Sequence, residues 1–144
     1  MNHWFFLFRL RHKRVVQAIV EAESRTSGEI RVVVTHLKCP DPMLTAREHF
    51  EKLGMTQTRH RNGVLIFMAP RTRNFAVIGD EGVHEKCGEH FWLAVAAHMS
   101  AELREGRFTE ALVHAVEESG ELLARHFPPD TENRNELPDR VIID

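Results

Sequence analysis

The chain alternates between segments with apolar residues every three or four positions and segments in which apolar residues alternate or run together. Helical spacing extends from Leu10 to Ser24, and the turn Thr26–Gly28 ends it. Residues 29–36 alternate apolar and polar positions and are rich in β-branched side chains, which predicts a strand. The sequence therefore predicts a helix followed by the first strand.

A second helix and a second strand follow. Asp41 suits the N-cap of that helix, Pro42 suits its first position, and Gly54 ends it. The continuous apolar run Val64–Ala69 has the length of a strand buried on both faces. Because a helix connects the two strands, we expect them to be parallel.

The remaining segments complete the predicted fold. The loop 70–74 is short enough for a hairpin, so the strand Phe75–Ile78 is expected to run antiparallel to the strand before it. One helical stripe is predicted from Val83 to Leu103, and a final helix is expected to be capped by Thr109. Helices before, between and after the strands cover both faces of the sheet. The expected architecture is a three-layer α/β/α sandwich with a small mixed sheet.

Length and composition fit one domain. The chain has 144 residues, of which 42% are hydrophobic and 28% are charged, so a self-sufficient core is feasible. We expect a single domain over residues 1–128, led by the aromatic run Trp4–Phe8, and an extended tail over residues 129–144. The apolar residues Val141–Ile143 of that tail are suited to dock on a sheet edge.

Charge and hydropathy limit the classes of partner. Nineteen basic and 21 acidic residues give a net charge of −2, which argues against nucleic acid as a partner. No apolar run approaches the roughly 20 residues of a membrane helix, and the N-terminal aromatic run lacks the pattern of a signal peptide. We therefore expect no membrane insertion, a cytoplasmic location and reduced cysteines. A protein partner stays open.

Three short motifs resemble, in order and spacing, those of the TPM-domain family. They are Thr26–Ile30 (TSGEI), Arg61–Ile66 (RNGVLI) and Ile78–Gly82 (IGDEG). The family takes its name from a thylakoid-lumen protein, a photosystem II repair factor and a nematode receptor modulator, and the tail segment 135–139 resembles short bacterial members. The resemblance, over roughly residues 5–128, implies an α/β/α fold. For function it implies an acid-type phosphatase, a divalent-metal binder, or an assembly or modulating factor.

The predicted topology brings candidate ligand residues to one end of the sheet. Glu29 begins the first strand, Asn62 precedes the second, and Asp80 and Glu81 follow the antiparallel third. Their oxygen atoms suit Ca²⁺ or Mg²⁺, so we expect a divalent-metal site made of these four residues. Clustered carboxylates repel one another, and either a cation or Arg61 would compensate that repulsion.

The same end of the sheet carries a candidate anion site. Arg61 and Arg59 are suited to hold a phosphate or a carboxylate there. A purely structural interpretation also stays open. In it, Asp80 caps the following helix, Gly82 only makes the turn, and the role of Glu29 is to pair with Arg61.

The sequence assigns no catalytic residue. It contains neither a G-x-S-x-G elbow nor a P-loop, and neither Cys39 nor Cys87 lies in a glycine-rich loop. His84, Cys87 and His90 do not suit one metal ion, because helical positions six residues apart point about 120° away from each other. Three functions stay open. The first is a binding or accessory module with a divalent-metal site, the second is a metal-dependent acid-type phosphatase, and the third is a purely structural protein-interaction domain.

Overall fold

A computed structural model describes residues 10–130 and 141–143, and its sheet has four strands. They are β1 (Glu29–Val34), β2 (Gly63–Ala69), β3 (Asn74–Gly79) and β4 (Val141–Ile143), in the order β3-β2-β1-β4. β1 is parallel to β2 and to β4, whereas β3 is antiparallel to β2. The predicted strand directions are confirmed, and Val141–Ile143 docks on the sheet edge.

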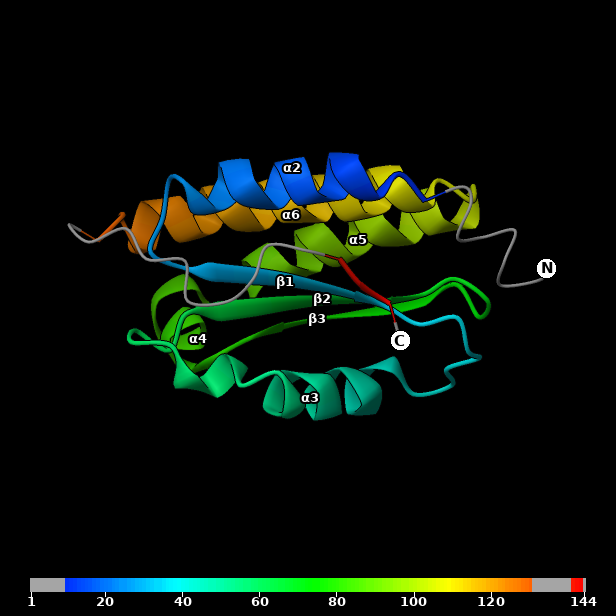
Figure 1. Cartoon of the computed structure of the whole chain (residues 1–144), viewed down its shortest axis with the longest axis horizontal. Coiled ribbons are helices and arrows are strands. Elements are labelled where there is room, and N and C mark those ends of the chain that lie inside the picture. Colours follow the sequence, from blue (N-terminus) through cyan, green and yellow to red (C-terminus); the bar gives the residue numbers. More distant parts are fainter. Residues whose placement is uncertain (1–9, 131–140, 144) are drawn as a thin grey trace.

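Helices cover both faces of the sheet (Figure 1). α2 (His12–Glu23), α5 (His90–Arg104) and α6 (Phe108–His126) form the layer on one face, and α3 (Pro42–Lys52) covers the other. The short helix α4 (Glu81–Cys87) lies at one end of the sheet, and the single turn η1 (Met55–Gln57) follows α3. This is the α/β/α sandwich that the sequence predicts.

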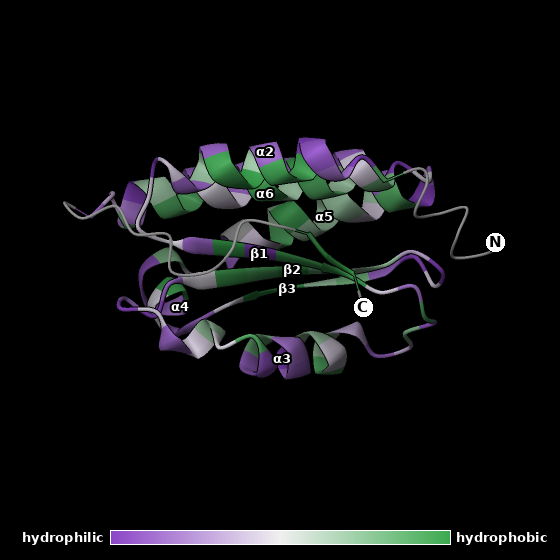
Figure 2. Ribbon diagram, viewed as in Figure 1, coloured by the Kyte–Doolittle hydropathy of each residue, from purple (hydrophilic) through white to green (hydrophobic). Residues whose placement is uncertain are grey.

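The sheet separates two apolar cores because successive side chains of a strand point to opposite faces. In β1, Ile30 and Val32 face the core beneath α2, α5 and α6, whereas Val33 faces the core beneath α3. Every residue of β2 is buried, which confirms that this strand is covered on both faces. Figure 2 shows the resulting hydrophobic colour along β2.

Local signals set the ends of α3. The Oδ1 atom of Asp41 accepts a hydrogen bond from the backbone N–H of Leu44 at 3.2 Å, and Pro42 occupies the first helical position. Gly54 adopts a left-handed conformation with φ of 69°, which lets the chain leave the helix. The predicted cap and the predicted stop are both confirmed.

The prediction of one helix from Val83 to Leu103 is wrong. Gly88, at φ of 73°, interrupts the segment and separates α4 from α5. Its backbone N–H donates to the carbonyl of His84, which closes the last turn of α4. The break is a single glycine with a positive φ, and the apolar stripe continues on both sides of it, so periodicity alone does not reveal it.

The predicted cap at Thr109 is also wrong. α6 begins at Phe108, and the N-cap position is held by Arg107, whose side chain makes no capping hydrogen bond. The hydroxyl of Thr109 instead accepts a hydrogen bond from the backbone N–H of Arg11 at 3.0 Å. Thr109 therefore ties the start of α2 to α6, a contact across 98 sequence positions.

Smaller differences concern element ends. β1 ends at Val34 and not at residue 36, because the Thr35 hydroxyl accepts from the N–H of Leu37 and turns the chain. The aromatic run Trp4–Phe8 and most of the predicted tail lie outside the described residues. Among the described residues, no helix combines the length and the apolar composition needed to cross a membrane.

Candidate functional site

The three motifs meet at one end of the sheet, as the topology predicts. Glu29 is in register with Gly63, at the start of β1 and β2. Val64 pairs with Gly79, and the backbone N–H of Asp80 donates to the carbonyl of Gly63 at 2.9 Å. Segments about 50 positions apart in the sequence thus become neighbours because β3 runs antiparallel to β2.

Asp80 is the best-connected side chain at this end. Its carboxylate is 5% exposed and caps α4 by accepting from the backbone N–H of Glu81 at 2.8 Å. It also accepts two hydrogen bonds from Arg61, from Nε at 2.7 Å and from Nη2 at 2.9 Å. A two-pronged guanidinium–carboxylate pair of this kind is strong and directional. Asp80 is therefore a helix cap and an ion-pair partner at once.

Arg61 is held by its backbone as well as by its side chain. It adopts φ of 50°, which is uncommon for a residue with a Cβ. Its N–H donates to the carbonyl of Thr58, and its carbonyl accepts from the N–H of Gly82 at 2.9 Å. The hydrogen bonds to Asp80 raise the pKa of the Arg61 guanidinium, and Glu81, at 3.6 Å, acts in the same direction. The positive charge is permanent.

Gly82 explains why the loop and α4 approach so closely. A Cβ atom at this position would lie 2.4 Å from the carbonyl oxygen of His60 and 2.7 Å from that of Arg61. Backbone atoms of a hydrogen-bonded loop have little room to move, so only glycine fits. The role of Gly82 is therefore not limited to the chain reversal after β3, because it lets the first turn of α4 pack directly against the loop that carries His60 and Arg61.

The four predicted metal ligands occupy one end of the sheet but differ in environment. β2 separates Glu29 from Asp80, which places their backbones about 10 Å apart. Glu29 is 2% exposed, whereas the Glu81 side chain is 75% exposed. Asn62 is 1% exposed and donates from Nδ2 to the hydroxyl of Ser27 at 3.2 Å. No three His, Cys, Asp or Glu side chains of the described residues are grouped so as to hold a metal.

The two predicted anion-binding arginines have different partners. Arg59 approaches Asp130, which follows α6, with 3.9 Å between Nη1 and Oδ2. His60 also contacts Asp130, at 3.1 Å. Arg61 turns to Asp80, which corrects the interpretation that pairs it with Glu29. Asp130 is absent from the sequence-based site because no local pattern points to a contact 70 positions away.

His84 and Cys87 lie in α4, whereas His90 begins α5, so the three residues do not share the single helix that the sequence argument assumed. His84 and His90 are exposed, and Cys87 is half-buried and free. Burial raises the pKa of the Cys87 thiol, although the charge of Lys86 opposes that shift. A thiol of this kind is less nucleophilic than free cysteine at neutral pH.

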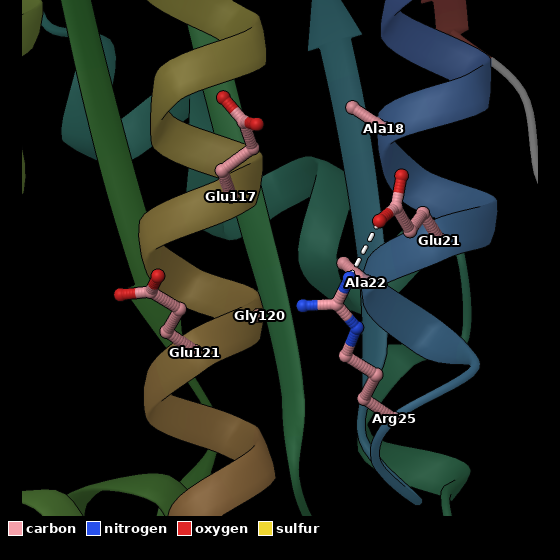
Figure 3. Close-up of a pocket in the computed structure, with 7 residues that line it drawn as sticks. All are labelled: Ala18, Glu21, Ala22, Arg25, Glu117, Gly120 and Glu121. Carbon is pink, nitrogen blue, oxygen red and sulfur yellow. Dashed lines mark hydrogen bonds and ion pairs between the residues drawn. The ribbon is translucent and has the colours of Figure 1, made fainter.

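The surface between α2 and α6 carries a small groove of about 120 Å³ (Figure 3). Gly120 of α6 faces Ala22 of α2 in this groove, and Arg25 donates a hydrogen bond from Nη2 to the carboxylate of Glu21. The groove is lined by Ala18, Glu21, Ala22, Arg25, Glu117, Gly120 and Glu121. None of these residues belongs to the three motifs, although Arg25 directly precedes the first of them.

The sandwich and its three convergent motifs define a domain of the TPM class. A family model for the TPM domain matches residues 6–122. The chain belongs to the TPM-domain family, and the resemblance inferred from the motifs is confirmed.

The fold is also similar to a solved structure. The NMR structure of the BA42 protein from the psychrophilic bacterium Bizionia argentinensis superposes with a TM-score of 0.84 and is 33% identical in sequence. The similarity covers 92% of this chain and 92% of that one. No curated protein matches the sequence. The family and the fold therefore rest on the family model and on this structural neighbour.

Proposed function

We propose that this TPM domain is a binding or accessory module that takes up a divalent cation, Ca²⁺ or Mg²⁺, at the motif-bearing end of the sheet. The observation that carries the proposal is the Oδ1 atom of Asn62. It is buried and accepts no hydrogen bond from the described residues. Such an atom costs about 1–3 kcal/mol, and a bound cation or its water would satisfy it.

The donor atoms suit a hard cation. Asp80 and Glu81 offer adjacent carboxylates, and Asn62 offers a neutral carbonyl oxygen. Glu29 provides a further carboxylate on the other side of β2. Ca²⁺ and Mg²⁺ accept such mixed oxygen sets and complete them with water. The different environments of these residues favour an ion held directly by Asp80 and Glu81, with Asn62 Oδ1 accepting a hydrogen bond from a water of that ion and Glu29 acting from farther away.

Cation binding at Asp80 involves an exchange with Arg61. The guanidinium covers both carboxylate oxygens, but its side chain is 41% exposed and has solvent to move into. The loop does not depend on that side chain alone, since backbone hydrogen bonds to Thr58 and Gly82 also hold it. Arg61 therefore competes with the cation for Asp80.

The alternative function, a metal-dependent acid-type phosphatase, uses the same ion to activate water. It also needs a cationic side chain for the phosphate. Arg61 is engaged by Asp80 and Arg59 lies near Asp130. This arrangement favours binding over turnover of a phosphate ester.

Thermal unfolding with millimolar Ca²⁺ or Mg²⁺ tests the proposal. The melting temperature of the native chain should rise with ion concentration, and Asp80→Asn should remove most of that rise. Arg61→Gln should strengthen ion binding because it removes the competing charge. Arg59→Gln is the matched control, since it removes the same charge from the same loop without touching Asp80.

Two results would overturn the proposal. If neither ion moves the melting temperature of the native chain or of Arg61→Gln, the cation site is wrong. If the chain steadily hydrolyses p-nitrophenyl phosphate with added ion, and Asp80→Asn abolishes that turnover without lowering the ion-free melting temperature, the phosphatase replaces the binding module.

A further inference from the structure

The end of the molecule opposite the motifs brings two loops and two helix starts together (Figure 1). They are the loop between β1 and α3, the hairpin loop between β2 and β3, and the starts of α2 and α3. The carbonyl of Cys39 accepts hydrogen bonds from Nδ2 of Asn74 at 2.7 Å and from the hydroxyl of Thr72 at 3.2 Å. The Cys39 thiol also lies 3.4 Å from the hydroxyl of Thr45 in α3. Cys39 therefore holds the two loops and the first turns of α3 against one another.

The two loops carry positive charge and no acidic residue. Residues 35–40 and 69–74 include Lys38, Arg71 and Arg73 but neither Asp nor Glu. Lys38 and Arg71 are exposed, and within the described part of the chain neither forms an ion pair. Arg73 has a different role, because its Nη1 donates to the carbonyls of Leu103 and Arg104 and ties the hairpin to the end of α5. Lys38 and Arg71 are thus available to an outside partner.

The start of α2 adds to this positive charge. Residues 10–14 contain no acidic residue, and Arg11 and Lys13 are exposed. The hydrogen bond from the backbone of Arg11 to Thr109 fixes this segment against α6. Arg14 lies 3.8 Å from Glu110, so its charge is partly balanced. These segments carry an excess of positive charge although the whole chain has a net charge of −2.

Exposed aliphatic side chains lie beside these charges. Leu37 is 53% exposed and directly precedes Lys38, and Leu44 is 54% exposed and lies in the first turn of α3. Consecutive Cα atoms are about 3.8 Å apart. Leu37 is two positions from Cys39, and Leu44 adjoins Thr45, which contacts Cys39. The two leucines are therefore placed around the same contact as the cationic loops.

We infer that this end of the molecule docks on the surface of an anionic lipid membrane. Negative headgroups attract Lys38, Arg71 and the start of α2, and Leu37 and Leu44 pack into the boundary between headgroups and acyl chains. A nucleic acid or an acidic peptide would balance the charges but would offer the leucines no apolar phase. The contact is peripheral, because loops and helix starts make it without crossing the bilayer.

The distribution of charge also sets the orientation of the docked domain. Asp80 and Glu81 lie at the opposite end, so an anionic surface repels them least when the basic end faces the lipid. The motif-bearing end then faces the solvent. The inference goes beyond the proposed function and does not depend on a cation at Asp80.

Sedimentation of the full chain with lipid vesicles tests the inference. The vesicles contain phosphatidylcholine alone or with about 30% phosphatidylglycerol, in EDTA so that no divalent ion bridges protein and lipid. The native chain should bind the anionic vesicles, and the binding should weaken as salt is raised. Each Lys or Arg near an anionic surface changes partitioning about fivefold, so Lys38→Gln/Arg71→Gln should weaken binding about tenfold or more.

Matched variants separate this surface from general effects of charge and hydropathy. Lys52→Gln/Arg125→Gln removes one Lys and one Arg from exposed positions near the ends of α3 and α6, and should bind as the native chain does. Leu37→Ser/Leu44→Ser should weaken binding about fivefold or more, because the apolar contact is lost. Leu93→Ser is its control, since Leu93 is 66% exposed but lies near the start of α5. Because every substituted side chain is exposed, the variants should keep the circular dichroism spectrum of the native chain.

Four results would overturn the inference. The first is that the native chain does not bind anionic vesicles, and the second is that the two charge variants bind equally. The third is that serine at positions 37 and 44 leaves binding unchanged, because the contact is then electrostatic adhesion alone. The fourth is binding to soluble poly-glutamate but not to vesicles, which would identify an acidic protein as the partner. None of these results affects the cation proposal, since no variant alters the motif-bearing end.

Discussion

Replacing Gly120 with alanine tests how closely α2 and α6 pack. A Cβ atom at position 120 would lie 2.6 Å from the Cβ atom of Ala22 and 3.3 Å from its Cα atom. Ordinary contacts of this kind begin near 3.4 Å. The two helices must therefore separate by about 1 Å at this contact, whose residues Ala22 and Gly120 are labelled in Figure 3.

Two opposing effects set the change in the free energy of unfolding caused by Gly120→Ala. Overpacking of a tight contact costs about 1–3 kcal/mol, and an alanine in a helix interior gains about 1 kcal/mol over glycine. We expect Gly120→Ala to lower the free energy of unfolding by about 1 kcal/mol. Ala22→Gly should also destabilise, by about 1–2 kcal/mol, because it loses helix propensity and a buried methyl group.

The double variant Ala22→Gly/Gly120→Ala separates contact from propensity. The two propensity changes have opposite signs, and the methyl group moves from one helix to the other, which removes the 2.6 Å approach between Cβ atoms and leaves the 3.3 Å approach to the Cα atom of residue 22. We expect a stability within about 0.5 kcal/mol of the native chain, and a coupling energy of about 2 kcal/mol. Urea unfolding of the four chains, followed by circular dichroism, measures each value. Additive effects of the two substitutions would refute the packing argument.

Two further predictions concern single sites. Gly82→Ala should destabilise by about 3 kcal/mol or more, because its Cβ atom would meet the carbonyl oxygen of His60 at 2.4 Å; a urea midpoint near the native value would contradict this. In a Cys39→Ser chain, alkylation of Cys87 by iodoacetamide should accelerate at a higher pH than alkylation of free cysteine, because burial raises the pKa of this thiol and the thiolate is the reactive form. If the alkylation rate of Cys87 depends on pH in the same way as that of free cysteine, the pKa of this thiol is not raised.

The candidate site was only partly predictable from the sequence. The order and directions of the strands bring the motifs to one end of the sheet independently of side-chain contacts. The proximity of Glu29, Gly63 and Asp80 therefore follows from one parallel and one antiparallel connection. The partner of Arg61 did not follow in the same way. Glu29 and Asp80 are both acidic and both lie at this end of the sheet, and the pairing of Arg61 with Asp80 is visible only in the folded chain.

Local chemistry in the sequence by itself determined the elements and their layers. The cap at Asp41, the stop at Gly54 and the apolar run of β2 depend on residues close together in the chain, so they can be recognised without the fold. Tertiary structure decided the contacts across long separations. The tie between Arg11 and Thr109 and the fit of Gly82 on its loop depend on how distant backbones approach, a distance that no short pattern encodes.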